Sequence, residues 1–177
     1  MKKYELTAEF IEKWGKKLFR IKALISFGSV EAGELGGYVE KEDNLAQDGN
    51  AWVYGDAWVY GDARVYGDAW VCGNAEVYGD ARVYGNARVC DNADYLLIGR
   101  IGSRFSFTTF FKNKDKGITV SCGCFLGTIA EFRAKVTDTH GNNKHAKIYN
   151  LAADMAELQI LGEEHFDKLN TNKSEPF

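Results

Sequence analysis

The most regular feature of the sequence is an alternation of small apolar, β-branched and polar positions between Gly49 and Asp94. Alanine recurs every six residues from 51 to 93, and valine follows two residues after each alanine from 53 to 89. The intervening positions are polar or aromatic, so alanine and valine face one side of an extended chain. The pattern predicts short strands that bury alanine and valine.

Turn chemistry separates these strands. Glycine followed by Asp or Asn precedes nearly every alanine, and the one departure is Asp91-Asn92. Both residue types tolerate the left-handed backbone of tight turns. Hairpins with Gly-Asp turns are an alternative. Strands of four residues make poor hairpins, however, and every turn here is alike, so eight six-residue units in unbroken register favour stacked coils.

The repeat resembles the hexapeptide repeat of left-handed parallel β-helices, in which three hexads make one triangular coil. That resemblance implies about three coils, with residues 18 apart stacked on one outward face. The first face then carries Trp52, Tyr54, Trp70, Cys72, Arg88 and Cys90. The second carries Trp58, Tyr60, Glu76, Tyr78, Asp94 and Leu96, and the third carries Arg64, Tyr66, Arg82, Tyr84 and Arg100.

The flanks lack the hexad. Residues 1–44 form an N-terminal capping segment, residues 45–100 the β-helix, and residues 101–177 a C-terminal β-hairpin with helices. In the first segment, Leu18 to Phe27 is typical of a strand, and Gly33 to Gly37 of a turn. Both flanks are expected to cap the solenoid, because its open edges would otherwise invite aggregation.

The C-terminal segment is predicted to be a small α+β unit. Phe105 to Phe111 and Ile118 to Cys122 predict a hairpin. Two amphipathic helices follow, over Thr128 to Val136 and Lys144 to Leu161. In the second helix one stripe holds four large apolar residues, Leu151, Met155, Leu158 and Leu161. The predicted fold is therefore mainly β: a short left-handed parallel β-helix with capping flanks and this α+β unit.

Two longer segments resemble uncharacterised hexapeptide-repeat proteins of phages and prophages. They read SFGSVEAGELGGYVEKEDNLAQDGNAWVYGDA and TTFFKNKDKGITVSCGCFLGTIAEFRAKV. The likeness extends from about Leu18 to about Tyr149. Such proteins are often described as acyltransferase-like or polymer-forming because of their repeat. The resemblance implies a phage or prophage accessory protein and supplies no activity.

Composition narrows the class of protein. The net charge of −3 gives no reason to expect nonspecific nucleic-acid binding. Polar residues interrupt the N-terminus too early for a signal peptide, and no apolar run approaches the ~18 residues of a membrane span. We expect a cytoplasmic protein in a bacterial host cell, with Cys72, Cys90, Cys122 and Cys124 reduced.

An enzyme is the less favoured alternative. Acyltransferases of the hexapeptide class use a histidine on or beside the coils, and residues 49–94 contain none. His140, His145 and His165 all lie in the C-terminal flank, although a flank histidine can reach a neighbouring subunit. We predict no catalytic residues and no cofactor.

The cysteines and histidines also permit metal or disulfide chemistry. Cys122 and Cys124 with His140 and His145 could supply four zinc ligands, but two small thiols on a strand and a polar loop are the favoured interpretation. No metal is predicted. Cys72 and Cys90 are expected on adjacent coils; a bond between them is an alternative to cysteine simply replacing tyrosine at a crowded surface.

The outward faces supply the candidate site. Exposed aromatic surface on this scale needs a cover, from other subunits, the flanks or a ligand. Arginines beside aromatic rings suit an anionic, nucleotide-like ligand or a host protein. The candidate binding residues are Arg64, Arg82, Arg88, Arg100, Tyr66, Tyr84, Trp52, Trp58 and Trp70.

Stacked arginines repel one another, so a counter-charge is expected. A homotrimer would bring Glu76 and Asp94, with Tyr60 and Tyr78, against the arginine face of the next subunit. The predicted function is a noncatalytic phage accessory protein that binds a host protein or nucleotide signal, as a counter-defence inhibitor. A hexapeptide-class acyltransferase using acyl-CoA and a structural phage component are the alternatives.

Overall fold

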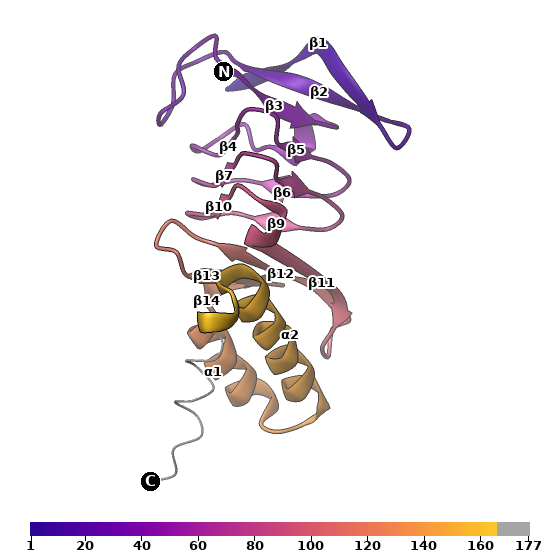
Figure 1. Ribbon diagram of the computed structural model, residues 1–177, viewed down its shortest axis with the longest axis vertical. Helices are drawn as coiled ribbons and strands as arrows, with labels where there is room; N and C mark the ends of the chain where they lie inside the picture. The colour runs from indigo at the N-terminus through magenta and orange to yellow at the C-terminus, as the bar shows by residue number, and fades with distance from the viewer. Residues whose placement is uncertain (166–177) are drawn as a thin grey trace. The chain divides into compact units, whose positions relative to one another are not determined.

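The computed structural model describes residues 1–165 and divides into two compact units. The first unit comprises residues 1–92, and the second begins at Ala93 (Figure 1). Strands dominate the first unit, and both long helices belong to the second. The prediction of a mainly β chain with a helical C-terminal part is confirmed.

In the first unit each hexad contributes a two-residue strand that ends in valine. These strands are β4 (Trp52–Val53), β5 (Trp58–Val59), β6 (Arg64–Val65), β7 (Trp70–Val71), β8 (Glu76–Val77), β9 (Arg82–Val83) and β10 (Arg88–Val89). Each pairs in parallel with the strand 18 residues away, so that Trp70 lies between Trp52 and Arg88. Parallel pairing at this period rules out hairpins within the repeat.

Alanine and valine fill the interior of the coils. All seven alanines from 51 to 87 and all seven valines from 53 to 89 are fully buried. Backbone hydrogen bonds join successive coils: Tyr54 N–H donates to the Val71 carbonyl at 2.8 Å, and Cys72 N–H to the Val89 carbonyl at 2.9 Å. Ala93, in the eighth hexad, is exposed, so the buried pattern ends with the seventh hexad.

An N-terminal hairpin extends one face of the coils. Strands β1 (Tyr4–Lys13) and β2 (Lys16–Ala23) pair antiparallel, and β2 pairs with β3 (Leu35–Val39). Strand β3 then pairs in parallel with β5, which gives a five-stranded sheet in the order β1-β2-β3-β5-β8. The other two faces are the sheets β10-β7-β4 and β6-β9.

The prediction of a turn throughout Gly33 to Gly37 was wrong, because Gly36 and Gly37 lie inside β3. These glycines serve close packing. A Cβ atom on Gly37 would lie 2.5 Å from the Ala57 carbonyl oxygen and 2.7 Å from a Val53 methyl carbon. Side chains are excluded at this point, where the hairpin enters the coils.

The chain start covers the first coil. The Lys3 side chain is buried, and its ammonium donates to the carbonyls of Asp48, Gly49 and Ala51 at 2.9–3.5 Å. Burial lowers the pKa of Lys3 to about 8. Tyr4 donates its hydroxyl hydrogen to a backbone carbonyl at the end of the short 3₁₀ turn η1 (Glu42–Asn44). The N-terminal segment thus supplies hydrogen-bond donors to backbone carbonyls of the first coil, where no preceding coil pairs with them.

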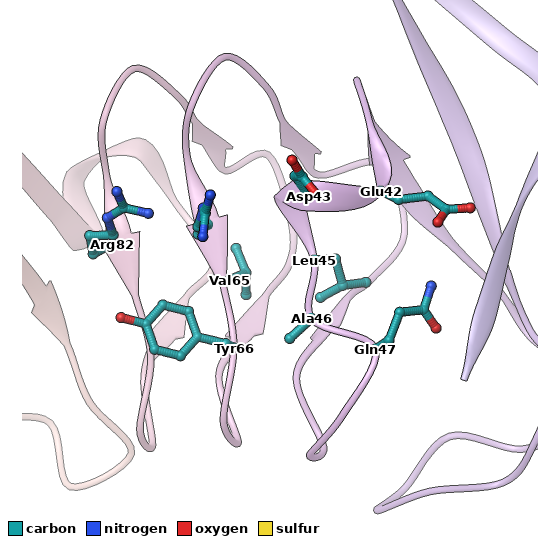
Figure 2. A pocket seen from close by; sticks show the side chains of 9 residues that line it. Glu42, Asp43, Leu45, Ala46, Gln47, Val65, Tyr66 and Arg82 are labelled. Carbon is teal, nitrogen blue, oxygen red and sulfur yellow. The ribbon is translucent and has the colours of Figure 1, made fainter. Parts of the chain in front are cut away.

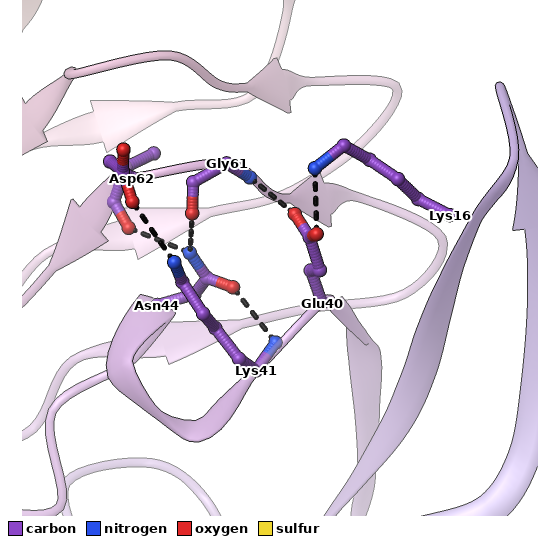
Figure 3. Close-up of polar contacts among 7 residues, drawn as sticks. Lys16, Glu40, Lys41, Asn44, Gly61 and Asp62 are labelled. Carbon is purple, nitrogen blue, oxygen red and sulfur yellow. Dashed lines mark hydrogen bonds and ion pairs between the residues drawn. The ribbon is translucent and has the colours of Figure 1, made fainter.

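Hydrogen bonds of Glu40 and Asn44, here called the Glu40 clasp, join the hairpin to the coils (Figure 3). The Glu40 carboxylate accepts from Lys16 Nζ at 2.6 Å and from Gly61 N–H at 2.6 Å. Asn44, buried in η1, donates to the carbonyls of Gly61 and Ala63. Burial raises the pKa of Glu40, but the two hydrogen bonds and nearby lysines outweigh it, so the net pKa is lowered.

The second unit is a four-stranded antiparallel sheet with two helices. The short 3₁₀ turn η2 (Asn92–Asp94) leads into the strands β11 (Tyr95–Ile101), β12 (Ser106–Lys112), β13 (Ile118–Cys122) and β14 (Phe125–Thr128), which pair in chain order. The predicted hairpin is β12–β13. Helices α1 (Ile129–His140) and α2 (Lys144–Leu161) follow. Helix α1 is longer than predicted, because the Thr128–Glu131 capping box fixes its start and Gly141 ends it.

The Glu40 clasp should make stability depend on pH. The pKa of Glu40 is lower in the folded state than its ordinary value of 4.5. The contribution of Glu40 to the unfolding free energy is therefore complete above pH 4.5 and is lost as the pH falls through the pKa of the folded state. Wild type should exceed Glu40→Gln by about 1 kcal/mol in unfolding free energy at pH 7, and the difference should shrink below pH 4.5. Urea unfolding across pH measures this. Glu12→Gln controls for loss of one negative charge from the hairpin; a pH-independent difference for Glu40→Gln would contradict the assignment.

Candidate functional site

The main hollow of the first unit lies on its arginine face. It encloses about 500 Å³ and is lined by Glu42, Asp43, Leu45, Ala46, Gln47, Arg64, Val65, Tyr66 and Arg82. Leu45 and Val65 are buried and form its apolar floor. Figure 2 shows Arg82 and Tyr66 at one end, with Glu42 and Gln47 at the other. The hollow therefore has a cationic and aromatic end opposite an acidic end.

The parallel register of β6 and β9 creates the cationic end. Arg64 and Arg82 occupy paired positions, one coil apart. The rings of Tyr66 and Tyr84 stack beside them, with centroids 4.5 Å apart and planes 12° apart. Burial raises the pKa of Tyr66, and Tyr84 adds to the rise while Arg82 and Arg64 oppose it. The strand register and the ring stacking thus bring these four residues together, as the sequence predicted.

Arg64 and Arg82 also border a second hollow of about 220 Å³. Its other lining residues are Lys41, Asp43, Asp62, Ala63 and Asp80. Lys41 Nζ donates to Asp62 at 3.0 Å (Figure 3). That hydrogen bond is the main reason why the pKa of Asp62 is lowered, and Arg64 contributes weakly in the same direction. Within residues 1–165, no carboxylate forms an ion pair with Arg64.

Arg88, Trp70 and Trp52 lie on a different face, the sheet β10-β7-β4. The Arg88 guanidinium lies 3.9 Å from the Trp70 ring centroid and donates to the carbonyls of Asp68 and Ala87. Arg88 is thus already engaged in the coil. The expectation that Trp52 is exposed was wrong: it is fully buried, packed edge-on against Tyr4 and Phe27 of the N-terminal segment.

Trp58 and Glu76 lie on the five-stranded sheet, and Tyr60 and Tyr78 follow its strands β5 and β8. Sequence reasoning missed a residue that contacts Trp58 and Tyr60. Trp14, 67% exposed, occupies the turn between β1 and β2, and its ring lies 6.0 Å from that of Trp58 and 5.5 Å from that of Tyr60. Tyr60 in turn stacks on Tyr78 at 5.4 Å. The hairpin turn thus covers part of the aromatic face that the repeat leaves outward.

Two predicted site residues, Asp94 and Arg100, lie in the segment that follows the seven regular hexads. Arg100 is exposed on β11, a strand of the antiparallel sheet of the second unit. Asp94 is buried in η2 and accepts from Lys112 Nζ at 2.7 Å. Both residues belong to the second unit, which begins at Ala93.

Cys72 and Cys90 form a disulfide across adjacent coils, with Cα atoms 4.2 Å apart. The expectation of two separate thiols at these positions was therefore wrong. Cys122 and Cys124 are free in the second unit. Burial raises the pKa of Tyr149 to about 12, and the neighbouring Cys122 adds to that rise.

The His140 ring lies 5.8 Å from the rings of both Tyr149 and His145. Together with Cys122 and Cys124, His140 and Tyr149 line a hollow of about 220 Å³ in the second unit. Within residues 1–165, no group of three or more His, Cys, Asp or Glu side chains is arranged to hold a metal ion.

The acidic end of the main hollow was also missed by sequence reasoning. Glu42 and Asp43 come from η1, and Gln47 from the segment that follows it. None belongs to the hexad repeat. The available signal was a cluster of charged, mostly acidic residues just before the array, Glu40-Lys41-Glu42-Asp43.

Comparison with known proteins identifies the repeat. Residues 57–73 and 75–91 match the profile of the YdcK β-solenoid repeat. These two segments lie within the parallel coils and support a β-solenoid repeat protein. A search of curated protein sequences gave no match. In the described part of the chain, no helix has the length and apolar character needed to cross a membrane.

Replacing Arg64 and replacing Arg88 should change the unfolding free energy in opposite directions. Arg64→Gln removes repulsion between stacked like charges and should raise the unfolding free energy by about 0.5 kcal/mol. Arg88→Gln, the matched control on the next face, should lower it by about 1–2 kcal/mol because it removes carbonyl hydrogen bonds and the contact with Trp70. Urea unfolding of both variants distinguishes the two roles. Equal destabilisation by both would mean that Arg64 is a structural residue like Arg88.

Proposed function

We propose that the first unit is a noncatalytic binding module and that its main hollow takes a small phosphate-bearing molecule of the nucleotide class. The observation that carries the proposal is the register that pairs Arg64 with Arg82 on the wall of this hollow. Two guanidiniums at neighbouring strand positions, roughly 5 Å apart, can both donate to one phosphate.

The ring of Tyr66 supports a planar group in the ligand. It is half-buried, stacked on Tyr84 on one side and part of the hollow wall. An aromatic base stacked on a tyrosine gains about 1–3 kcal/mol. Leu45 and Val65 offer apolar surface beside it. The hollow thus combines phosphate recognition with a surface for a base.

The acidic end narrows the ligand further. Glu42 would accept hydrogen bonds from an amino-bearing base and would repel a second cluster of phosphates. Glu42 is paired with Lys2 at 2.7 Å, but both side chains are about half exposed, and such a surface pair is weak. We therefore propose a mononucleotide rather than a nucleic-acid strand.

The wider role follows from the sequence resemblance. We propose a left-handed coil, as in hexapeptide-repeat proteins, and an accessory role in a phage or prophage, where binding withholds a nucleotide signal from a host process. A homotrimer is expected from the resemblance to left-handed β-helices and from the counter-charge that the arginine stack needs. Asp43, Asp62 and Asp80 of the same chain line a hollow with both arginines, so the charge argument does not require a neighbouring subunit.

Calorimetric titration tests the proposal with AMP and ATP as probes. Wild type should bind at least one of them. The double variant Arg64→Gln/Arg82→Gln should bind at least about tenfold more weakly, because each arginine supplies charge-assisted hydrogen bonds worth about 1.5–3 kcal/mol.

The matched control is Arg100→Gln, which removes an exposed arginine from the second unit and should leave affinity unchanged. Glu42→Gln should alter the preference among bases more than the affinity for phosphate. Absence of binding by wild type, or equal binding by the double variant, would count against the proposal.

A further inference from the structure

Helix α2 has two different faces. One is packed into the core of the second unit through Ala146, Tyr149, Ala152, Ala153, Ala156 and Ile160. On the other face, Leu151 is 63% exposed, Met155 57% and Leu158 45%. Their spacing of four and three residues aligns them as one stripe along the helix. The structure thus turns most of the predicted apolar stripe toward solvent, while Leu161 is partly buried.

The stripe is presented rigidly. Asn143 caps the start of α2 by accepting from the N–H groups of His145 and Ala146, and Gly162 ends the helix. Arg133 on α1 forms ion pairs with Asp154 at 2.7 Å and Glu157 at 2.6 Å. The fold holds α2 through its other face, so the exposed stripe is not needed to fix the helix. A contiguous apolar stripe of this kind indicates an interaction surface.

The charges at the ends of α2 indicate what covers the stripe. Lys144 and Lys147 lie in its first turn, which contains no acidic residue. Glu163 and Glu164 follow its end, and its last turn contains no basic residue. All four side chains are exposed. This order opposes the helix dipole, which favours acidic residues at the start and basic residues at the end.

The same order complements an antiparallel copy of the helix. In such a pair, the lysines of one copy approach the glutamates of the other, and each helix start meets the other helix end. Helical periodicity places Lys144 and Lys147 on the same side as Leu151, Met155 and Leu158. An axis of twofold symmetry near Met155 would set Leu151 against Leu158 and Lys147 against Glu163. The charge order that is unfavourable in one chain becomes favourable in two.

We propose that a second copy of this chain covers the stripe, through antiparallel twofold pairing of α2. The contact is isologous and therefore closes as a dimer. It uses residues of the second unit alone and is independent of the nucleotide site proposed for the first.

Sedimentation equilibrium over a concentration series tests the dimer. Wild type should form a dimer, and Met155→Glu should weaken it at least tenfold. Leu24→Glu, which alters a leucine of similar exposure (40%) in the first unit, should not. Lys147→Glu and Glu163→Lys should each weaken the dimer several-fold, and the double variant should recover it. Circular dichroism checks that every variant stays folded.

A cross-linking experiment tests the antiparallel register. Met155→Cys, next to the axis, should give a covalent dimer under mild oxidation. Leu151→Cys should not, because its two copies would be separated by about 12 Å along the helices. A monomer at every concentration, or an oligomer unaffected by Met155→Glu, would overturn the proposal, as would no recovery in the charge-swapped double variant.

Discussion

The first unit depends on one constraint: successive coils must bond to one another through their backbones every 18 residues. Bonds such as Tyr54 N–H to the Val71 carbonyl fix the spacing between coils. Alanine and valine fill the space inside the coils, and from residue 51 to residue 89 they are fully buried. Because this inner pattern leaves no freedom in register, each outward residue is stacked on its counterpart one coil away. The Arg64–Arg82 pair and the Tyr66–Tyr84 stack are consequences of that spacing.

The three faces of the coils carry different stacked side chains, and so they make different contacts. On one face, Arg88 is engaged by Trp70 and two carbonyls, and a disulfide joins Cys72 to Cys90. On the five-stranded sheet, Trp14 covers Trp58 and Tyr60. The arginine face carries the 500 Å³ hollow, and η1 adds carboxylates at its far end. A ligand site arises where a regular wall of the coil meets an irregular segment.

The coils and the α2 helix could be predicted from sequence because both depend on local periodicity. The period of six placed every interior alanine and valine from 51 to 89, and the apolar spacing located α2 from Lys144 to Leu161. Contacts between distant segments could not be predicted. Trp52 is buried by Tyr4 and Phe27, which no repeat specifies. Periodicity likewise reveals a stripe on α2 without showing which of its two apolar faces enters the core.

Native mass spectrometry of the protein purified gently from bacterial cells is the most direct test of the central claim, that paired arginines on the coil hold a nucleotide. The account predicts that wild type retains an added mass matching a nucleotide. It also predicts that Arg64→Gln/Arg82→Gln, purified in the same way, loses that mass while keeping the same oligomeric state. An adduct kept by the double variant, or wild type free of any adduct even after incubation with the nucleotide probes, would contradict the claim.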